Sequence, residues 1–297
     1  MITLSNKATI LVCTCDSYSD LWYPFFKLLA YYWPNLDCKI ILNTETKSFA
    51  FEGLQIDCYS MGSDSYGQRM IDHLEKITTD YTILLLDDFF LRRPVNVNTL
   101  EKIVDRMDND PDIAAFYCNK SEFCKDGDNI CGFYELKRYA PYRLNMQAAV
   151  WRTEKLAKYW EPKDNPWIWE IFVNYLTFDT ADKFYSLRDL SESPIYYGYN
   201  PDGMGVFRGK WVENDVKPLF EKHNIVVDYS KRGFYEPDRA IARLPIMKTM
   251  PYVFKRLPLK YAFLFSLYEI MKRILRLIGL RPKYQNYNEY LCYSHAY

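Results

Sequence analysis

Apolar runs typical of β-strands alternate with helical stretches along the first part of the chain, and this alternation permits few folds. The strand-like runs occupy 8–13, 39–43, 54–59, 81–86 and 113–118, and the helical stretches occupy 20–33, 65–77 and 97–108. Such alternation favours a mostly parallel sheet flanked by helices, and near-continuous apolar strands fit a sheet covered on both faces. We therefore expect an α/β fold built on such a sheet.

The pattern changes at about residue 119, where turn-rich and aromatic segments replace the regular alternation. No linker rich in glycine, proline or serine separates the two parts. We therefore expect one domain over 1–245, with a nucleotide-binding half at 1–118 and an irregular acceptor-side half at 119–245. A basic extension, 246–297, follows it.

Charge and composition exclude several classes of protein. The formal net charge is zero, which argues against a nucleic-acid binder, and 49% hydrophobic residues are enough for a large core. None of the eight cysteines forms a Cys-x-x-Cys pair, and three histidines make a histidine-based metal site or triad improbable. The first residues lack the basic and apolar regions of a signal peptide, so we expect a cytoplasmic protein with free thiols.

Polar residues follow the strand-like runs at their carboxyl ends. Thr14 and Asp16 follow the first run, Asn43 ends the second, and Asp87 and Asp88 follow the fourth. In open α/β sheets, ligands bind beyond these ends. For Asp16, a role as a helix cap is an equal alternative. For Asp87 and Asp88, the alternative is a turn in which nearby arginines pair with them.

The same edge of the predicted sheet has features suited to a diphosphate. Gly67, Gln68 and Arg69 open a helix, and the free N–H groups of a helix start favour an anion. The carboxylates of Asp87 and Asp88 suit Mg²⁺ or Mn²⁺, which in turn binds a diphosphate. This layout predicts a nucleotide-sugar donor.

At this point the sequence resembles a family, the bacterial GT-A-type glycosyltransferases of surface-polysaccharide (capsular or O-antigen) biosynthesis. The resemblance covers roughly 8–211 and is carried by TCDSYSDLWYPFFKLLAYYWP, LNTE, ILLLDDFFL, YRLNMQAAVWRTEKLAKYW and NPWIWEI in that order. It implies a Rossmann-like half, a nucleotide-diphosphate sugar donor and a divalent cation at the acidic strand end. The usual metal motif is Asp-x-Asp, whereas Asp87 and Asp88 are contiguous.

The second half supplies candidates for the acceptor side. Asn145 and Gln147 lie two apart in the extended segment 143–151, so both amides can face one side toward sugar hydroxyls. The resemblance implies that Glu170 is the base that deprotonates the acceptor, and its apolar neighbours would raise its pKa. The alternative for Glu170 is a carboxylate stabilised at a helix start.

Three tryptophans and one glycine-rich loop complete the set of candidates. Trp167, Trp169 and Trp211 suit a wall that stacks on sugars, although core packing is the alternative for each of them. The loop 201–211 carries Arg208 and Lys210, which would neutralise phosphate charge if the loop closed over the donor. An exposed hairpin is the alternative for this loop.

The C-terminal extension is basic and periodic. Residues 248–283 contain nine lysines and arginines and one acid, Glu269. Apolar residues spaced by three and four from Leu257 to Ile278 define one helix face. We expect 251–283 to lie on an anionic membrane surface, with packing on the main domain as the alternative. The protein would then be peripheral on the inner face of the cell membrane.

These features predict an inverting, metal-assisted glycosyltransferase. It would move a sugar from a nucleotide-diphosphate donor to a hydroxyl of a lipid-linked or oligosaccharide acceptor. Two alternatives stay open: a non-catalytic carbohydrate- or nucleotide-binding subunit of a membrane-associated assembly, and a nucleotidyltransferase with the same fold and metal.

Overall fold

The chain forms an α/β fold around one mixed sheet, as the alternation predicts. In this computed structural model, residues 4–60, 62, 65–198, 205–236, 246–263 and 267 are described. Within them, eight strands form a sheet in the order β3-β2-β1-β4-β7-β5-β8-β6. The strands are β1 (Ala8–Cys13), β2 (Ile40–Asn43), β3 (Ile56–Cys58), β4 (Tyr81–Leu86), β5 (Ile113–Lys120), β6 (Phe133–Glu135), β7 (Ala149–Arg152) and β8 (Lys183–Leu187).

Four parallel strands form one half of the sheet. The chain runs from β1 outward through β2 to β3 and then returns to place β4 on the other side of β1. The direction of winding therefore reverses between β1 and β4. In open α/β sheets this switch point is where ligands bind, beyond the carboxyl ends of the strands.

An antiparallel strand from the second half of the chain lies in the middle of the sheet. β7 pairs with β4 on one side and with β5 on the other, and Val150 is opposite both Ile83 and Phe116. Of the extended segment expected at 143–151, 149–151 lie in β7, which ends at Arg152. One sheet thus joins the two halves expected from sequence.

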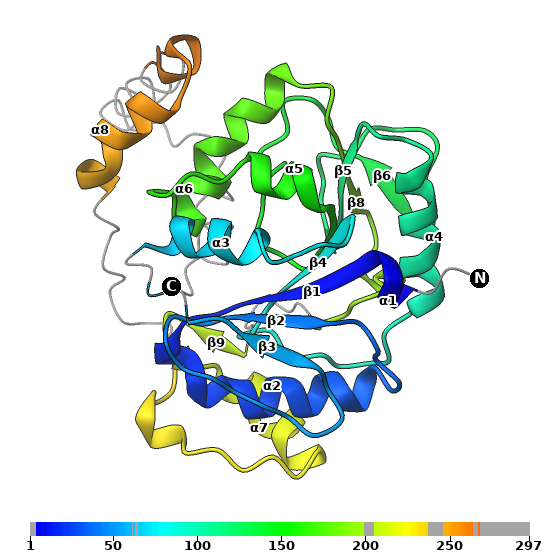
Figure 1. Cartoon of the computed structure of the whole chain (residues 1–297), viewed down its shortest axis with the longest axis vertical. Coiled ribbons are helices and arrows are strands. Elements are labelled where there is room, and N and C mark those ends of the chain that lie inside the picture. Colours follow the sequence, from blue (N-terminus) through cyan, green and yellow to red (C-terminus); the bar gives the residue numbers. More distant parts are fainter. Residues whose placement is uncertain are drawn as a thin grey trace.

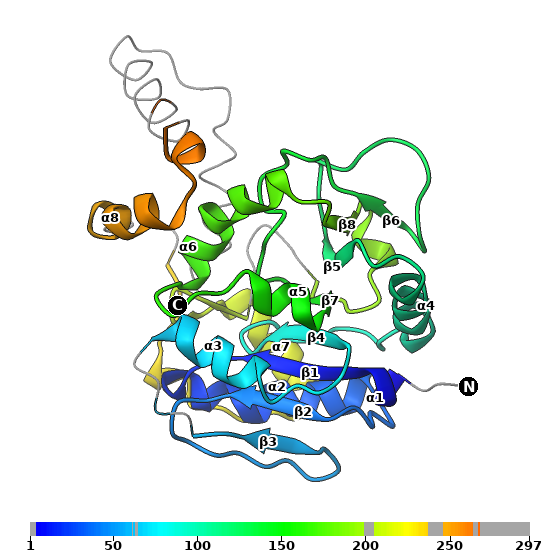
Figure 2. The ribbon, with the colours of Figure 1, turned by 45° about the horizontal axis from the view of Figure 1, so that its top comes forward.

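Helices cover both faces of the sheet. α2 and α7 lie on one side, and α3 and α5 lie on the other (Figures 1 and 2). A two-stranded hairpin, β9 (Val206–Phe207) and β10 (Lys210–Trp211), stands apart from the main sheet. The helices are α1 (Leu4–Lys7), α2 (Ser19–Tyr32), α3 (Tyr66–Leu74), α4 (Val97–Asp108), α5 (Thr153–Lys158), α6 (Pro166–Ile171), α7 (Glu213–Lys222) and α8 (Ile246–Arg256), and the 3₁₀ turns are η1 (Asp16–Tyr18), η2 (Val173–Asp179), η3 (Leu190–Glu192) and η4 (Tyr229–Lys231).

The start of the C-terminal extension packs on the main body. Leu257 and Tyr261 are buried, and the Tyr261 ring lies 5.7 Å from that of Tyr175. The expected membrane-facing side is therefore covered by protein at these two positions, because the aromatic surface of η2 offers a nearer apolar partner. Helical structure also breaks at Leu257, since Pro258 follows it. The rest of the expected face, from Leu264 to Ile278, lies outside the described residues.

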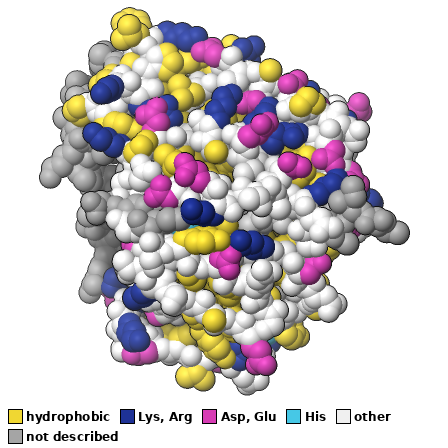
Figure 3. Space-filling model, viewed as in Figure 1, with side chains coloured by type: hydrophobic (Ala, Val, Ile, Leu, Met, Phe, Trp, Pro, Cys, Tyr) yellow, Lys and Arg dark blue, Asp and Glu magenta, His cyan; other side chains and the backbone are white. Residues whose placement is uncertain are grey.

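Surface charge is mixed on the face seen in Figure 3, where basic and acidic side chains are interspersed. This agrees with the zero net charge. Among the described residues, no helix has both the length and the hydropathy needed to cross a bilayer.

Candidate functional site

Two adjacent carboxylates lie at the switch point of the sheet. The chain turns directly after β4, and Asp87 and Asp88 are both completely buried there. Asp87 Oδ2 accepts a hydrogen bond from the Thr14 hydroxyl at the end of β1. Within the described residues, Asp87 Oδ1 and both carboxylate oxygens of Asp88 have no hydrogen-bond partner. Three orphaned acidic oxygens in one buried place are costly unless a cation or a proton compensates them.

Burial makes the charged forms of Asp87 and Asp88 unfavourable. Burial raises the pKa of Asp87 well above its usual range, and the neighbouring charge of Asp88 raises it further. Burial also raises the pKa of Asp88, while the charge of Arg232 opposes the rise at both groups. A divalent cation would relieve this strain more fully than one arginine at a distance.

The pair suits a cation that shares its ligands with phosphate. Mg²⁺ is usually held by one or two carboxylates together with water and substrate phosphates. No group of three or more His, Cys, Asp or Glu side chains within the described part of the chain is arranged to hold a metal. An ion at Asp87 and Asp88 would therefore take its other ligands from water or from a bound diphosphate.

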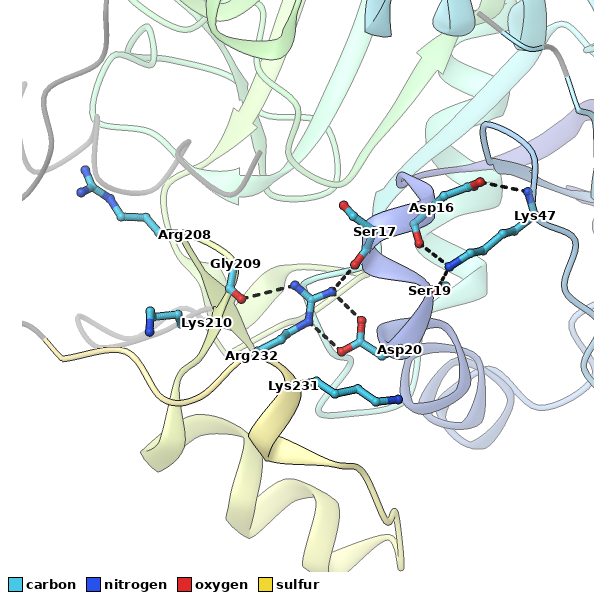
Figure 4. Close-up of a pocket in the computed structure, with 10 residues that line it drawn as sticks. All are labelled: Asp16, Ser17, Ser19, Asp20, Lys47, Arg208, Gly209, Lys210, Lys231 and Arg232. Atoms are coloured by element: carbon cyan, nitrogen blue, oxygen red, sulfur yellow. Dashed lines mark hydrogen bonds and ion pairs between the residues drawn. The ribbon is translucent and has the colours of Figure 1, made fainter. Parts of the chain in front are cut away.

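A polar pocket of about 460 Å³ lies beside the start of α2. One wall comes from η1 and α2, another from the turn of the β9–β10 hairpin, and a third from the end of η4 (Figure 4). Its lining residues are Asp16, Ser17, Ser19, Asp20, Lys47, Arg208, Gly209, Lys210, Lys231 and Arg232. Five of the ten are cationic and two are acidic, so the pocket suits an anion.

Arg232 ties the walls of the pocket together. Its guanidinium donates to both oxygens of Asp20, at 2.5 and 2.7 Å, and to the carbonyls of Ser17 and Gly209 (Figure 4). It also lies 4.2 Å from the ring centre of Tyr18. Because its charge acts on both Asp87 and Asp88 as well, Arg232 is an electrostatic link between the pocket and the acid pair.

Among the described residues, Arg232 pairs with Asp20, and the other four cations of the pocket have no acidic partner. Lys47 donates to the Asp16 carbonyl and the Ser19 hydroxyl, which leaves the charges of Arg208, Lys210 and Lys231 as the most available. Arg208 and Gly209 form the hairpin turn with φ of 53° and 74°, as a two-residue turn of this twist requires. Glycine adopts this conformation freely, but an arginine held there costs on the order of 1 kcal/mol. Arg208 and Lys47 mark opposite ends of the pocket (Figure 4).

Asp16 organises the loop after β2. Its carboxylate accepts the backbone N–H groups of Glu45, Thr46 and Lys47, and the Thr46 hydroxyl. Burial alone would raise the pKa of Asp16, but these hydrogen bonds outweigh it and lower the pKa. Asp16 therefore shapes one wall of the pocket, and its carboxylate is already occupied by protein donors.

Arg69 and Asn43 belong to a buried network at the strand ends. Arg69 donates to Asn43 Oδ1 at 2.8 Å, to Glu45 Oε1 at 3.1 Å and to the carbonyl of Thr14 at 3.3 Å. The Asn43 amide nitrogen lies 2.9 Å from the sulfur of Met70. Asn43 and Arg69, which were both predicted to bind the donor, are hydrogen-bonded to each other in this structure and hold the carboxyl ends of β1 and β2 together.

The first turn of α3 is used for packing. A Cβ atom at Gly67 would meet the Asp164 carbonyl oxygen at 2.7 Å and its nitrogen at 2.9 Å, so only glycine allows this approach. Ser65 caps the helix by accepting the N–H of Gln68. The Gln68 side chain donates to Asp72. These contacts direct the helix start toward the 161–164 segment of the protein.

Glu170 is a buried carboxylate on α6. Asn165 caps this helix and Pro166 occupies its first position, which places Glu170 in the second turn. Its Oε1 accepts the Met146 N–H at 2.7 Å, while Oε2 has no partner within the described residues. Burial raises the pKa of Glu170 from 4.5 to about 8. A carboxylate in such a state is a strong proton acceptor once it is ionised.

The other acceptor-side candidates divide into two groups. Asn145 is buried and its amide donates to the Tyr142 carbonyl at 3.0 Å, whereas Gln147 and Trp167 are half-buried. Trp169 and Trp211 are completely buried, the first stacked on Trp160 and the second packed on Phe90 and Phe220. These two indoles are core side chains here, which corrects the expectation of a stacking wall at their positions.

Sequence reasoning did not single out Lys231, Arg232, Lys47 or Asp20 for this site. Asp20 and Arg232 are 212 positions apart in the chain, and neither ends a predicted strand. The only local signal was a Lys-Arg-Gly run after a tyrosine and a serine, which many surface turns share.

Comparison with known proteins gives partial likenesses. The sequence matches no protein-family model and no curated protein. TarS 1–349 from S. aureus is similar over 62% of this chain and 58% of its own length, with 14% identity and a TM-score of 0.42.

Two further solved structures are similar over shorter or weaker alignments. A mannosyltransferase from Pyrobaculum calidifontis, PcManGT, solved with GDP-Man and Mn²⁺, matches 51% of this chain and 46% of its own, with 15% identity and a TM-score of 0.35. A CMP-2-keto-3-deoxy-manno-octonic acid synthetase solved with CTP matches 61% of this chain and 89% of its own, with 13% identity and a TM-score of 0.35. These are partial likenesses in backbone, and the chain spans less than two thirds of the TarS 1–349 chain.

Proposed function

We propose that this protein is a glycosyltransferase of the GT-A type. It moves a sugar from a nucleotide-diphosphate donor to a hydroxyl of a lipid-linked or oligosaccharide acceptor in surface-polysaccharide synthesis. The observation that carries the proposal is the set of three unpartnered oxygens of Asp87 and Asp88 at the switch point, linked by Arg232 to a cationic pocket. This arrangement suits a cation together with a diphosphate.

On the donor side, the chain contributes both signs of charge. Asp88, with both oxygens free, and Asp87 Oδ1 would hold Mg²⁺ or Mn²⁺, which neutralises charge on the departing nucleoside diphosphate when it is bound. Arg208, Lys210 and Lys231 have no acidic partner among the described residues, so their charges are available to the phosphate oxygens.

On the acceptor side, Glu170 would act as the base. In its ionised form, which its raised pKa places at the alkaline end of the physiological range, the free Oε2 would take the proton of the acceptor hydroxyl while that oxygen attacks the anomeric carbon and the bond to the diphosphate breaks. A single displacement of this kind inverts the anomeric centre. Trp167 is half-buried on the same helix as Glu170, and the half-buried Gln147 follows Met146, whose N–H binds Glu170, so both would contact an acceptor sugar.

A lipid-linked acceptor fits the C-terminal extension. Leu259 and Phe263 are 87% and 63% exposed on a helical turn whose other side packs on η2 through Tyr261, and Leu267 is 42% exposed. Nine lysines and arginines between 248 and 283 favour an anionic surface. The protein would thus lie on the inner face of the cell membrane, with these three side chains in the interface.

The test is a screen of nucleotide sugars by thermal shift and donor hydrolysis, with and without Mn²⁺. We expect a hit that needs Mn²⁺ and disappears in Asp88→Asn. A hit that survives removal of both Asp87 and Asp88 contradicts the metal-assisted site. Pyrophosphate release from a nucleoside triphosphate and a sugar phosphate indicates the nucleotidyltransferase instead. Binding without turnover of any donor–acceptor pair indicates a non-catalytic subunit.

A further inference from the structure

A chain of hydrogen bonds leads from α2 to the acid pair. The Trp22 indole N–H donates to the Thr14 hydroxyl oxygen at 2.8 Å, and the Thr14 hydroxyl donates to Asp87 Oδ2. Trp22 is 2% exposed, and Thr14 and Asp87 are completely buried. The three side chains are therefore shielded from solvent and are hydrogen-bonded directly to one another.

Which group donates and which accepts in this chain of hydrogen bonds follows from the protons that each side chain carries. An indole N–H can only donate, so the Thr14 oxygen must accept from Trp22. The hydroxyl then has one proton to give, and two acceptors lie in reach: Asp87 Oδ2 and the Cys15 carbonyl at 3.3 Å. The carboxylate oxygen is the nearer of the two, and in the ionised form that would bind a cation it is also charged, so it receives the hydrogen bond from the Thr14 hydroxyl.

The consequence is a fixed orientation of Asp87. With Oδ2 held by Thr14, the carboxylate cannot rotate without losing a buried hydrogen bond, and Oδ1 stays free beside Asp88. Trp22 packs edge-on against Phe49 at 5.8 Å, which fixes the indole in turn. Groups that orient a metal ligand in this way commonly change metal affinity when they are removed.

We propose that Thr14 and Trp22 are positioning residues for a divalent-cation site at Asp87 and Asp88, acting through the hydrogen bond that fixes Asp87 Oδ2. This proposal depends on the proposed function in one respect, which is that a cation binds at Asp87 and Asp88. It assigns to Thr14 a role in ordering the carboxylate, whereas sequence analysis expected Thr14 to contact the donor.

The experiment measures Mn²⁺ binding to the full chain by electron paramagnetic resonance, without donor or acceptor. Thr14→Val removes the hydroxyl and keeps the shape, and we expect its Mn²⁺ affinity to fall about tenfold or more. Thr14→Ser restores the donor and should bind within about twofold of wild type. The matched control is Thr82→Val on β4, which removes a buried hydroxyl bonded to Thr153 at 2.9 Å. It should bind like wild type.

A second readout detects the chain directly and tolerates modest losses of stability. The ¹⁵N–¹H resonance of the Trp22 indole should shift when Mg²⁺ is added to wild type, and should not shift in Asp88→Asn. Trp22→Phe keeps the aromatic packing and should weaken Mn²⁺ binding less than Thr14→Val does.

The outcomes separate the two proposals. The positioning role is overturned if wild type binds Mn²⁺ and Thr14→Val binds it with the same affinity. It is also overturned if Thr82→Val loses as much affinity as Thr14→Val. Neither result contradicts the proposed glycosyltransferase function. A wild-type protein that binds Mn²⁺ and shows the expected variant series but transfers no sugar supports the positioning role and contradicts the proposed function. Absence of both Mn²⁺ binding and the Mg²⁺ shift in wild type overturns the site itself.

Discussion

The backbone N–H of Met146 donates to Oε1 of Glu170 at 2.7 Å, and this is the only hydrogen bond to the carboxylate within the described residues. One short bond does not compensate a buried charge, so the pKa of Glu170 is raised to about 8. Glu170 therefore stays protonated in the folded protein over a pH range in which an exposed glutamate is ionised.

The first prediction concerns stability against pH. The unfolded chain ionises Glu170 near pH 4.5 and the folded chain near pH 8, so the unfolded state binds fewer protons between these values and stability falls as pH rises through them. Glu170→Gln should remove this penalty, which is on the order of several kcal/mol at pH 8. Thermal unfolding from pH 4.5 to 8 should show a growing advantage of the variant, with Glu154→Gln on the surface as control. A constant difference across this range would contradict the raised pKa.

The second prediction concerns the acid pair. Asp88→Asn should raise the melting temperature of the free protein, because it removes a buried charge that has no protein partner. The same variant should lose Mn²⁺-dependent donor binding. Asp126→Asn is the control, because its side chain is 95% exposed. If Asp88→Asn destabilised the protein by as much as a core mutation, the carboxylate would have a partner that the structure does not show.

The third prediction concerns the cationic pocket. Lys231→Ala should raise the KM for a nucleotide-sugar donor by about tenfold, the effect of about 1.4 kcal/mol, and should reduce the salt dependence of KM. Lys217→Ala is the matched control, because Lys217 pairs with Glu213 on α7 and does not line the pocket. Steady-state kinetics at two ionic strengths measure both effects. Equal KM values for the two variants would place the diphosphate elsewhere.

The fourth prediction concerns the packing of α3. Gly67→Ala should destabilise the protein by about 2 kcal/mol or more, since the added methyl group meets the rigid backbone of Asp164. Gln68→Ala, one residue further along the same turn, should cost far less. Chemical denaturation compares them. A stable Gly67→Ala with weakened donor binding would instead favour the ligand-facing role expected from sequence.

The fifth prediction concerns the membrane. Replacing both Leu259 and Phe263 with serine should reduce binding to vesicles that contain anionic lipid, because these exposed side chains supply the apolar contact. Val226→Ser, at a position 91% exposed on another part of the molecule, is the control. Vesicle sedimentation measures the bound fraction. If the double variant bound the vesicles as well as wild type does, this helical segment would not be the part that contacts the membrane.

The sequence predicted the regular part of the fold because each element there carries its own periodicity. The bounds expected for β1, β4 and α4 are those observed, and the polar residues at the ends of β1, β2 and β4 do gather at one edge. What it could not predict is pairing between distant segments. Nothing local in Ala149–Arg152 indicates that this strand enters the sheet between β4 and β5.

The candidate site was predictable to the same extent. The burial of Glu170 and the placement of Asp87 and Asp88 follow from apolar neighbours in the sequence. The wall formed by Lys231 and Arg232 does not, because it depends on a contact across 212 positions with Asp20. The interior positions of Trp169 and Trp211 also depend on tertiary packing, which decides whether an aromatic ring meets a ligand or another ring.

The position of β7 has a consequence for how such a protein can be divided or recombined. A fragment that ends at residue 118 would leave the long edges of β4 and β5 bare, and exposed edges of this kind invite aggregation. The acid pair at the tip of β4 therefore depends on a strand made some sixty residues later. A chimaera of related chains would have to keep Ala149–Arg152 together with β4 and β5, the strands that pair with it. Its junctions should therefore lie outside the sheet and not between the two halves of the sheet.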